Sequence, residues 1–234
     1  MGDAIVVGNL RGLIVFDLDG TLIDSERDLA DSVNALLVEG GAEALPLASI
    51  ASMVGDGAAA LIRRAFDAAR LQMHDRSLAR FLELYDDRLT RTTRPYPGMI
   101  EALQTLTQRS RCAVLTNKPL GHTQRLLEEL DLARFFSASV GGDGPFPRKP
   151  DPAGLLHLVA QHAATSDTTV LVGDSHVDAA TAAAAGTGFC LAEYGFGART
   201  IREEQLRPSD LRISRPLDLP GVLKDVGGGR TCER

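Results

Sequence analysis

The spacing of the hydrophobic positions changes along the chain and divides it into segments of different expected structure. Residues 13–16 form a short, uninterrupted apolar run that stops at two aspartates, which is typical of a buried strand ending in a polar loop. From residue 25 to about residue 91 the apolar residues recur every three or four positions, beginning with Leu29, Val33 and Leu36. This spacing places them on one face of a helix, so the segment predicts a bundle of about four helices.

Beyond residue 94 helical patterns alternate with short apolar runs, and the tight turns of β-hairpins do not occur between them. Such alternation indicates a parallel sheet covered by helices. The later strand-like runs lie at residues 112–116, 138–140, 169–172 and 188–191. We therefore expect an α/β fold: a doubly wound parallel sheet with a Rossmann-like core, into which an α-helical cap domain is inserted after the first strand.

The expected domain boundaries follow from the same change of pattern. Residues 1–21 and 94–234 would form the discontinuous α/β core, and residues 22–93 would form the helical cap. Ser25 and Asp28 have the spacing of a capping box at the start of the first cap helix, so we expect each side chain to bond to the other's backbone N–H group.

Composition and charge narrow the range of functions. The 234 residues are 44% hydrophobic and 24% charged, values typical of a folded globular domain. The formal net charge of −6 and the aromatic content of 5% disfavour a nucleic-acid-binding surface, which needs basic and stacking side chains. The apolar run near the start is far shorter than the roughly 20 residues of a membrane span, and no secretory signal pattern precedes it, so we expect a cytoplasmic protein without a membrane partner.

The cysteines Cys112, Cys190 and Cys232 are odd in number and widely spaced. Disulfide frameworks and metal sites show paired or closer spacings. We therefore expect Cys112 and Cys190 to be small core residues inside strands, and Cys232 to be a free thiol near the C-terminus.

Polar residues gather where the expected strands end. In an open parallel sheet, the carboxyl ends of the strands form the edge at which ligands bind. Reading those ends in chain order gives Asp17 and Asp19, Thr116 and Asn117, Lys149, and finally Asp174 and Asp178. These side chains should therefore converge on one edge of the sheet, and this convergence is the main functional signal in the sequence.

Three of the acids, Asp17, Asp19 and Asp174, would repel one another unless a cation lay between them. Carboxylate oxygens without a thiol or an imidazole suit Mg²⁺, which also binds phosphate oxygens. A carboxylate that attacks a phosphate dianion from about 4 Å meets a repulsion of roughly 8 kcal/mol at an effective dielectric constant of about 20. Mg²⁺ and Lys149 would supply the opposing charge, and the Thr116 hydroxyl would hold a phosphate oxygen.

These residue types suggest the roles of a phosphoryl-transfer site. Asp17 would be the nucleophile that forms an aspartyl-phosphate, and Asp19 would protonate the leaving alkoxide and later activate water. The metal ligands would be Asp17, Asp19, whose backbone carbonyl could reach the ion, and Asp174, with Asp178 orienting Asp174 from one helical turn further on. In the cap, Arg64 would reach the non-phosphate end of the substrate, such as a carboxylate. The candidate substrate-binding residues are thus Thr116, Asn117, Lys149 and Arg64.

The four stretches that carry these residues resemble the four motifs of haloacid dehalogenase-like phosphatases, in the same order. They are residues 17–25 (DLDGTLIDS), 115–119 (LTNKP), 148–152 (RKPDP) and 173–178 (GDSHVD). Within that superfamily the chain is most similar to the phosphoglycolate phosphatase family, on the basis of residues 54–57, 141–143 and 194–197. The resemblance implies Mg²⁺-dependent hydrolysis of a small phosphomonoester, first of all 2-phosphoglycolate, with the cap closing over it. Val177 departs from the fourth motif, in which Asn or Thr is common.

Other functions stay open on the sequence alone. The substrate could be a nucleotide, pyrophosphate or a sugar phosphate, and a sugar-phosphate mutase of the same family would pass the phosphoryl group to a second hydroxyl. Thr21 after the Asp-Gly pair favours a phosphatase over a mutase. A protein of another class, the signalling receiver domain, also accepts phosphate on an aspartate, but it is much shorter and has no inserted bundle. The expected partner is a small phosphorylated metabolite, and the sequence does not indicate the oligomeric state.

Overall fold

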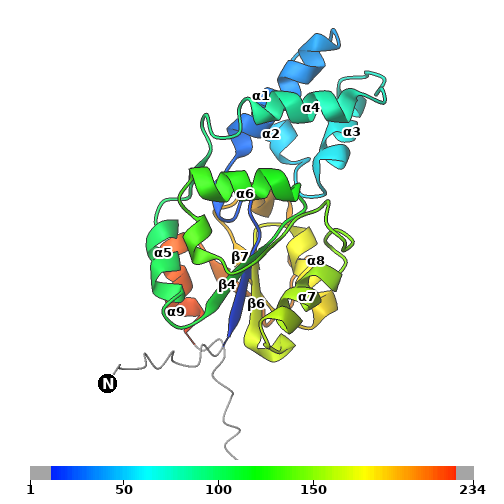
Figure 1. Ribbon diagram of the computed structural model, residues 1–234. Coiled ribbons are helices and arrows are strands. Elements are labelled where there is room, and N and C mark those ends of the chain that lie inside the picture. The colour runs from blue at the N-terminus through cyan, green and yellow to red at the C-terminus, as the bar shows by residue number, and fades with distance from the viewer. Residues whose placement is uncertain (1–11, 225–234) are drawn as a thin grey trace, which may run out of the picture.

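A parallel β-sheet forms the centre of the structure, which is a computed structural model that describes residues 12–224 (Figure 1). The strands of this six-stranded sheet follow the order β5-β4-β1-β6-β7-β8, and each pairs in parallel with its neighbours. Their bounds are β1 (Leu13–Phe16), β4 (Arg111–Leu115), β5 (Ser139–Val140), β6 (Thr169–Gly173), β7 (Gly188–Ala192) and β8 (Leu211–Ile213). The expected α/β fold class is therefore confirmed.

Helices cover both faces of the sheet (Figure 1). The core helices in the described range are α5 (Met99–Leu106), α6 (Leu120–Glu129), α7 (Ala153–Gln161), α8 (His176–Ala185) and α9 (Leu219–Val222). The connections contain the short 3₁₀ helices η1 (Ala133–Phe135), η2 (Ser166–Thr168), η3 (Gly197–Thr200), η4 (Glu203–Gln205) and η5 (Pro216–Asp218).

The central strand β1 is buried on both faces, which explains its uninterrupted apolar sequence. Successive side chains of a strand point to opposite faces. Ile14 and Phe16 therefore pack in the cluster that contains α5, α6 and α9, whereas Leu13 and Val15 pack in the cluster that contains α7 and α8. All four side chains are completely buried. The polar residues that follow β1 are thus held at a fixed point of the sheet edge.

A bundle of helices stands above the carboxyl edge of the sheet (Figure 1). Its helices are α1 (Glu26–Glu39), α2 (Leu47–Ala51), α3 (Ala58–Ala68) and α4 (Ser77–Asp86). Helix α1 packs against the other three. The chain enters and leaves the bundle through β2 (Ile23–Asp24) and β3 (Arg94–Pro95), which pair antiparallel. A two-stranded ribbon therefore connects the bundle to the core.

The capping box expected between Ser25 and Asp28 is wrong. Ser25 does precede α1, but its hydroxyl donates to Asp19 Oδ1 at 2.6 Å and not to the helix backbone. The Asp28 carboxylate instead accepts hydrogen bonds of 2.7–3.1 Å from the N–H and hydroxyl groups of Thr92 and Thr93. Partners far away in the sequence have displaced the local bond, and Asp28 ties the start of the bundle to its end.

The two cysteines within the described residues are core side chains, as expected. Cys112 lies in β4 and Cys190 in β7, both buried and both unpaired. Burial raises the pKa of each thiol to about 12, so neither is a reactive thiolate at neutral pH. Cys232 lies outside the described residues.

Candidate active site

The carboxyl ends of β1, β4 and β6 meet at a pocket beneath the helical bundle. The core lines it with Asp17, Asp19, Thr116, Asn117, Lys118, Pro119, His122, Asp174, Ser175, Phe196 and Gly197. The bundle lines it with Leu29, Val54, Gly55, Gly57, Ala58, Leu61, Phe81, Leu82 and Tyr85. The volume within the cavity that the centre of a water molecule can occupy is about 50 Å³. A cavity that holds a single water needs about 10–15 Å³ by the same measure. The pocket therefore suits a small ligand.

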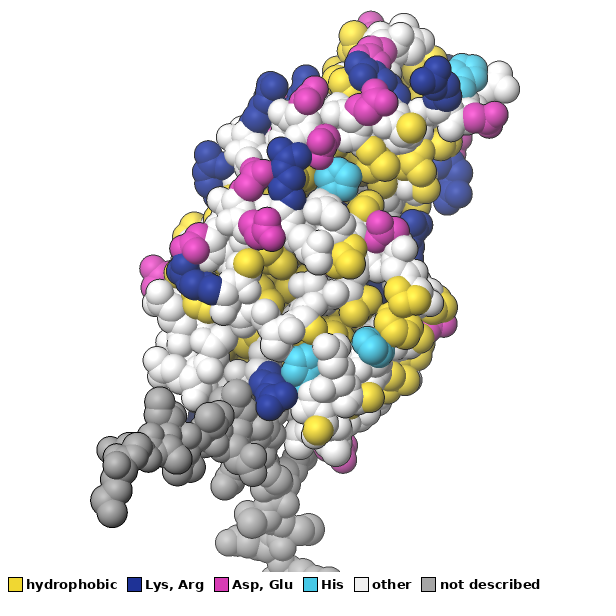
Figure 2. Space-filling model, viewed as in Figure 1, with side chains coloured by type: hydrophobic (Ala, Val, Ile, Leu, Met, Phe, Trp, Pro, Cys, Tyr) yellow, Lys and Arg dark blue, Asp and Glu magenta, His cyan; other side chains and the backbone are white. Residues whose placement is uncertain are grey.

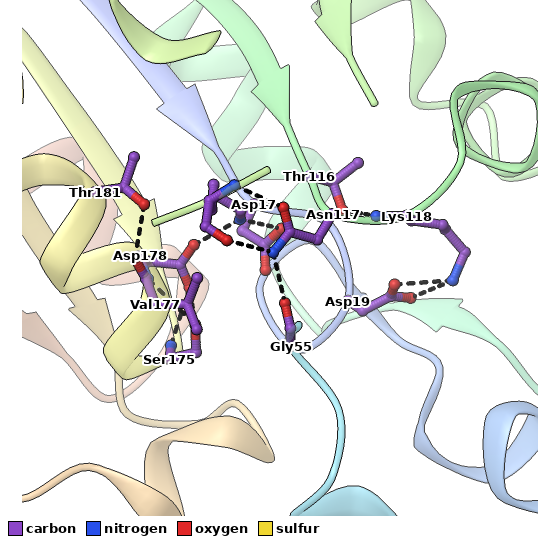
Figure 3. Close-up of polar contacts among 11 residues, drawn as sticks. Asp17, Asp19, Gly55, Thr116, Asn117, Lys118, Ser175, Val177, Asp178 and Thr181 are labelled. Atoms are coloured by element: carbon purple, nitrogen blue, oxygen red, sulfur yellow. Dashed lines mark hydrogen bonds and ion pairs between the residues drawn. The ribbon is translucent and has the colours of Figure 1, made fainter. Parts of the chain in front are cut away.

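Lys149 lies between two carboxylates at this edge. Its Nζ is 2.8 Å from Asp17 Oδ1 and 2.6 Å from Asp178 Oδ1. Burial alone would lower the pKa of Lys149, but the two carboxylates raise it, so the side chain is a charged ammonium. Asp178 Oδ2 accepts bonds from the N–H and the hydroxyl of Ser175, at 3.0 and 2.5 Å, in a capping box at the start of α8 (Figure 3). The capping of α8 thus fixes Asp178, and Asp178 fixes Lys149 beside Asp17.

Asp174 completes a cluster of three carboxylates. Asp17, Asp174 and Asp178 each offer an oxygen, and these oxygens lie within 4.8 Å of one another. Asp174 is only 2% exposed, and its Oδ2 accepts a bond of 2.8 Å from the N–H of Gly197. A Cβ at Gly20, where φ is +85°, would lie 2.0 Å from the same oxygen. Glycine at this turn therefore allows the chain after β1 to close over Asp174.

The charges of the cluster fit a divalent cation. The cluster contains three carboxylates, and the ammonium of Lys149 pairs with two of them, so negative charge is in excess. Burial, opposed by Lys149 and reinforced by Asp178, raises the pKa of Asp17 to about 6. Burial together with the charges of Asp17 and Asp178 raises the pKa of Asp174 well above its usual range. A hard cation with oxygen ligands, such as Mg²⁺, would compensate this charge, and the donor set matches its preference.

The Asp19 carboxylate points away from this cluster. Lys118 Nζ donates to both of its oxygens, at 2.8 and 3.0 Å, and Ser25 Oγ donates to Oδ1 (Figure 3). Asp178 is therefore the third member of the carboxylate cluster, in the place expected for the Asp19 carboxylate, and metal binding by the Asp19 backbone carbonyl stays a prediction. The side chain of Asp19 nevertheless lines the same pocket.

Thr116 and Asn117 follow β4 at the floor of the pocket. Thr116 Oγ1 accepts a bond of 3.2 Å from the N–H of Lys118. The Asn117 amide donates to the carbonyls of Lys149 and Gly55, each at 2.9 Å, and accepts from the N–H of Lys149, also at 2.9 Å (Figure 3). Both N–H groups of this amide are used within the protein. Asn117 therefore positions the Lys149 loop and a loop of the bundle. The role expected of Asn117 was a contact with the substrate.

Arg64 is not brought into the pocket that contains Asp17. Its guanidinium pairs with Asp56 and donates to the carbonyl of Met53 at 2.8 Å. It lines a separate cleft between the bundle and the core, together with residues such as His176. The predicted contact of Arg64 with the substrate is not favoured, because Arg64 lines this other cleft and not the pocket of Asp17. The contact stays a prediction.

Lys118 and Ser175 are site residues for which no role was predicted from the sequence. A signal existed for each. The chain contains only Lys118, Lys149 and Lys224 as lysines, and Lys118 follows an expected strand at the same sheet edge as Lys149. Ser175 and Asp178 have the capping-box spacing that was applied to a different serine.

Comparison with known proteins agrees with this geometry. Residues 14–192 match the family model described as haloacid dehalogenase-like hydrolase. A phosphoglycolate phosphatase of Cereibacter sphaeroides is 42% identical over 219 residues, which are 91% of this chain and 98% of its own. A phosphoglycolate phosphatase of Mesorhizobium japonicum is 38% identical over 198 residues, which are 82% of this chain and 87% of its own. The crystal structure of a predicted phosphoglycolate phosphatase from Haemophilus somnus superimposes with a TM-score of 0.84 at 28% identity, covering 92% of this chain and 99% of its own.

Proposed function

The chain belongs to the haloacid dehalogenase-like hydrolase family, and from this premise we propose that it releases phosphate from 2-phosphoglycolate. It is a phosphoric monoester hydrolase, because its relatives over most of its length are phosphatases. The observation that carries the proposal is the buried Asp17 carboxylate, which lines a pocket of small-ligand size and lies 2.8 Å from the Lys149 ammonium.

Asp17 is the nucleophile in this proposal. Its N–H donates to the carbonyl of Val172 at 2.9 Å, so β1 and β6 fix its backbone. Its approach to a phosphate dianion costs roughly 8 kcal/mol at about 4 Å and an effective dielectric constant of about 20. The Lys149 ammonium offsets part of this repulsion because it is already held in place. The Thr116 hydroxyl donates to a phosphate oxygen, and the attack leaves an aspartyl-phosphate.

Asp19 is the general acid and base. It lies two residues after Asp17 and lines the same pocket. In its protonated form it gives a proton to the ester oxygen that leaves, and the carboxylate so formed later takes a proton from the water that attacks the aspartyl-phosphate. Lys118 and Ser25 hold its two oxygens, so its position is defined before the substrate arrives.

Mg²⁺ is the cation that we propose for this site. Asp17 and Asp174 would hold it, and Asp178, which lies in the same carboxylate cluster, would orient Lys149. Bound there, the ion supplies positive charge for the carboxylates and for the phosphate oxygens.

We propose that residues 22–93 act as a cap on a core made of residues 1–21 and 94–234. The hydrogen bond from Asn117 Nδ2 to the carbonyl of Gly55 links the two parts across the pocket. Apolar side chains of the bundle, such as Leu61 and Phe81, form the roof. An apolar roof over the site limits the access of water to the phosphoryl transfer and favours a small metabolite over a large one.

The surface is compatible with such a substrate. On the face drawn in Figure 2, basic and acidic side chains are interspersed, so this side of the described residues offers no continuous basic stripe for a nucleic acid. None of the helices within residues 12–224 combines the length and the apolar character of a membrane span. The cytoplasmic location remains a prediction from the sequence.

A panel of phosphate compounds tests the proposal. Phosphate release is measured with Mg²⁺ for 2-phosphoglycolate, a nucleoside monophosphate, pyrophosphate and a sugar phosphate, and we expect the highest kcat/KM for 2-phosphoglycolate. Asp17→Asn should abolish release, whereas the matched control Asp167→Asn, on the exposed η2, should not change it. A higher kcat/KM for another compound would reject the proposed substrate, and near-normal turnover by Asp17→Asn would reject the nucleophile.

A further inference from the structure

One corner of the pocket is polar although its surroundings are apolar. Lys118 follows β4, Tyr85 lies near the end of α4 in the bundle, and His122 lies in the first turn of α6, and all three line the pocket. Lys118 Nζ is 4.6 Å from the centre of the Tyr85 ring, and the ring centres of Tyr85 and His122 are 5.7 Å apart. Figure 1 shows α6 at the side of the core that faces the bundle. Core and bundle therefore bring three polar side chains to one place.

Two of these side chains carry buried polar atoms without a hydrogen-bond partner. Within the described part of the chain, such atoms are Tyr85 Oη, His122 Nε2 and Thr21 Oγ1. Asp86 Oδ1 lies 3.5 Å from His122 Nε2, beyond the range of a good hydrogen bond. Tyr85 is 2% exposed, and burial raises its pKa to about 12, so it carries a proton to donate. Because an unpaired buried donor destabilises a protein, an acceptor in this corner would be bound favourably.

Lys118 adds a positive charge to the same corner. Its Nζ donates to both oxygens of the Asp19 carboxylate, at 2.8 and 3.0 Å, which is the geometry of a charged ammonium in an ion pair. An ammonium has three N–H groups, and with its two contacts to Asp19 the remaining one lies on the side of Tyr85, where a ligand between the two residues would meet it. The corner thus offers a charged donor and a neutral donor, and the chemistry that fits both is a carboxylate.

We propose that Lys118 and Tyr85 form the subsite that binds the carboxylate of the substrate, with His122 beside it. The inference deepens the proposed function and rests on it, because 2-phosphoglycolate carries a carboxylate at the end opposite its phosphate. Lys118 comes from the core and Tyr85 from the bundle, so a carboxylate between them also holds the cap to the core. The subsite takes the task that the sequence analysis gave to Arg64, and it selects small phosphorylated carboxylic acids over neutral phosphate esters.

The test compares two esters that differ in the carboxylate. Tyr85→Phe removes the hydroxyl and keeps the ring against Lys118. We expect it to lower kcat/KM for 2-phosphoglycolate about 10-fold, or about 1.4 kcal/mol, mainly through KM. For ethyl phosphate, which has no carboxylate, we expect a change of less than about 2-fold, since no bond is lost there. The matched control Tyr96→Phe removes a hydroxyl from a tyrosine that packs against Tyr194 outside the pocket, and should change neither ester.

A second variant examines the charge. Lys118→Met should reduce the ratio of kcat/KM between 2-phosphoglycolate and ethyl phosphate about 10-fold or more, even though the loss of the Asp19 ion pair slows both reactions. Equal losses for the two esters in both variants, or unchanged kinetics of Tyr85→Phe, would overturn the subsite. Failure of the wild-type protein to hydrolyse 2-phosphoglycolate would instead reject the proposed function, and the subsite with it.

Discussion

Replacing Lys149 by methionine should destabilise the protein as well as inactivate it. The substitution keeps a long side chain but removes the ammonium that lies 2.8 Å from Asp17 and 2.6 Å from Asp178. Lys149 is 5% exposed, so little water can replace the lost charge. The expected loss of phosphate release is at least about 100-fold, the usual effect of deleting a group that stabilises developing charge.

The size of the destabilisation can be worked from these distances. At an effective dielectric constant of about 20, each ion pair of this length is worth roughly 6 kcal/mol of direct attraction. Relaxation and the solvation of the charges reduce the net effect, and loss of one partner from a buried pair typically costs about 3–5 kcal/mol. We therefore expect the free energy of unfolding of Lys149→Met to be about 3–5 kcal/mol lower than that of the wild type, at pH 7 without metal.

A charge-balanced double variant separates the electrostatic cause from a packing defect. Lys149→Met combined with Asp178→Asn removes one charge of each sign, so the cluster returns to its original net charge. Because the two residues are in contact, their effects should not add, and the double variant should regain about half of the lost stability. Phosphate release should stay as low as in the single variant.

Urea unfolding followed by circular dichroism gives the free energies, with EDTA present to exclude metal binding. Phosphate release is measured on the same preparations with Mg²⁺. A double variant no more stable than Lys149→Met would refute the electrostatic reasoning, because it would mean that the methionine packs badly and that the excess negative charge is harmless. Lys149→Met with full activity would refute its role beside the nucleophile.

Three further outcomes can be measured. Asp28→Asn should lower the free energy of unfolding by about 2–3 kcal/mol, because an amide cannot accept all the bonds from Thr92 and Thr93. Burial would raise the pKa of Asp28, but these bonds lower it. The stability that the Asp28 carboxylate contributes is therefore complete above the ordinary aspartate pKa and is lost as the pH falls through the lowered pKa. Urea unfolding from pH 7 to pH 3 should show the free energies of unfolding of the variant and the wild type converging. EDTA should abolish phosphate release, and added Mg²⁺ should restore it and raise the Tm, since a cation bound to the folded state stabilises it; activity that survives exhaustive chelation would contradict the metal site. Cys112 and Cys190 should resist alkylation in the folded protein at pH 7, and peptide mapping that finds either one rapidly modified would contradict their burial.

The strands that position the site could be predicted because the sheet buries them on both faces. The runs at residues 112–116 and 169–172 differ by a residue or so from β4 and β6, since a fully buried strand must be apolar throughout. The strand β8 was missed. It lies at the edge of the sheet, has three residues and buries only Ile213, so its sequence has neither the length nor the apolar character of the others.

Which residues reach the sheet edge could be predicted, but not where each side chain points. The topology alone brings the ends of β1, β4 and β6 together. The carboxylate of Asp19 turns from the cluster because Lys118 and Ser25 offer it three donors. Asn117 similarly faces the Lys149 loop, whose backbone presents both a donor and an acceptor to its amide. These partners come from segments distant in sequence, so local pattern does not contain them.

The two capping-box spacings of this chain show where local signals fail. Ser25 with Asp28 and Ser175 with Asp178 have the same separation before a helix, yet only the second pair forms the box. At the first site, Asp19 takes the hydroxyl, and distant threonines take the carboxylate. At the second site, Lys149 approaches the remaining oxygen of Asp178 without competing for the cap. The local rule is broken where the chain enters the cap: Ser25 joins the cap to the core, and Asp28 joins the start of the cap to its end. Sequence patterns should be expected to mislead at positions that hold distant parts of the chain together.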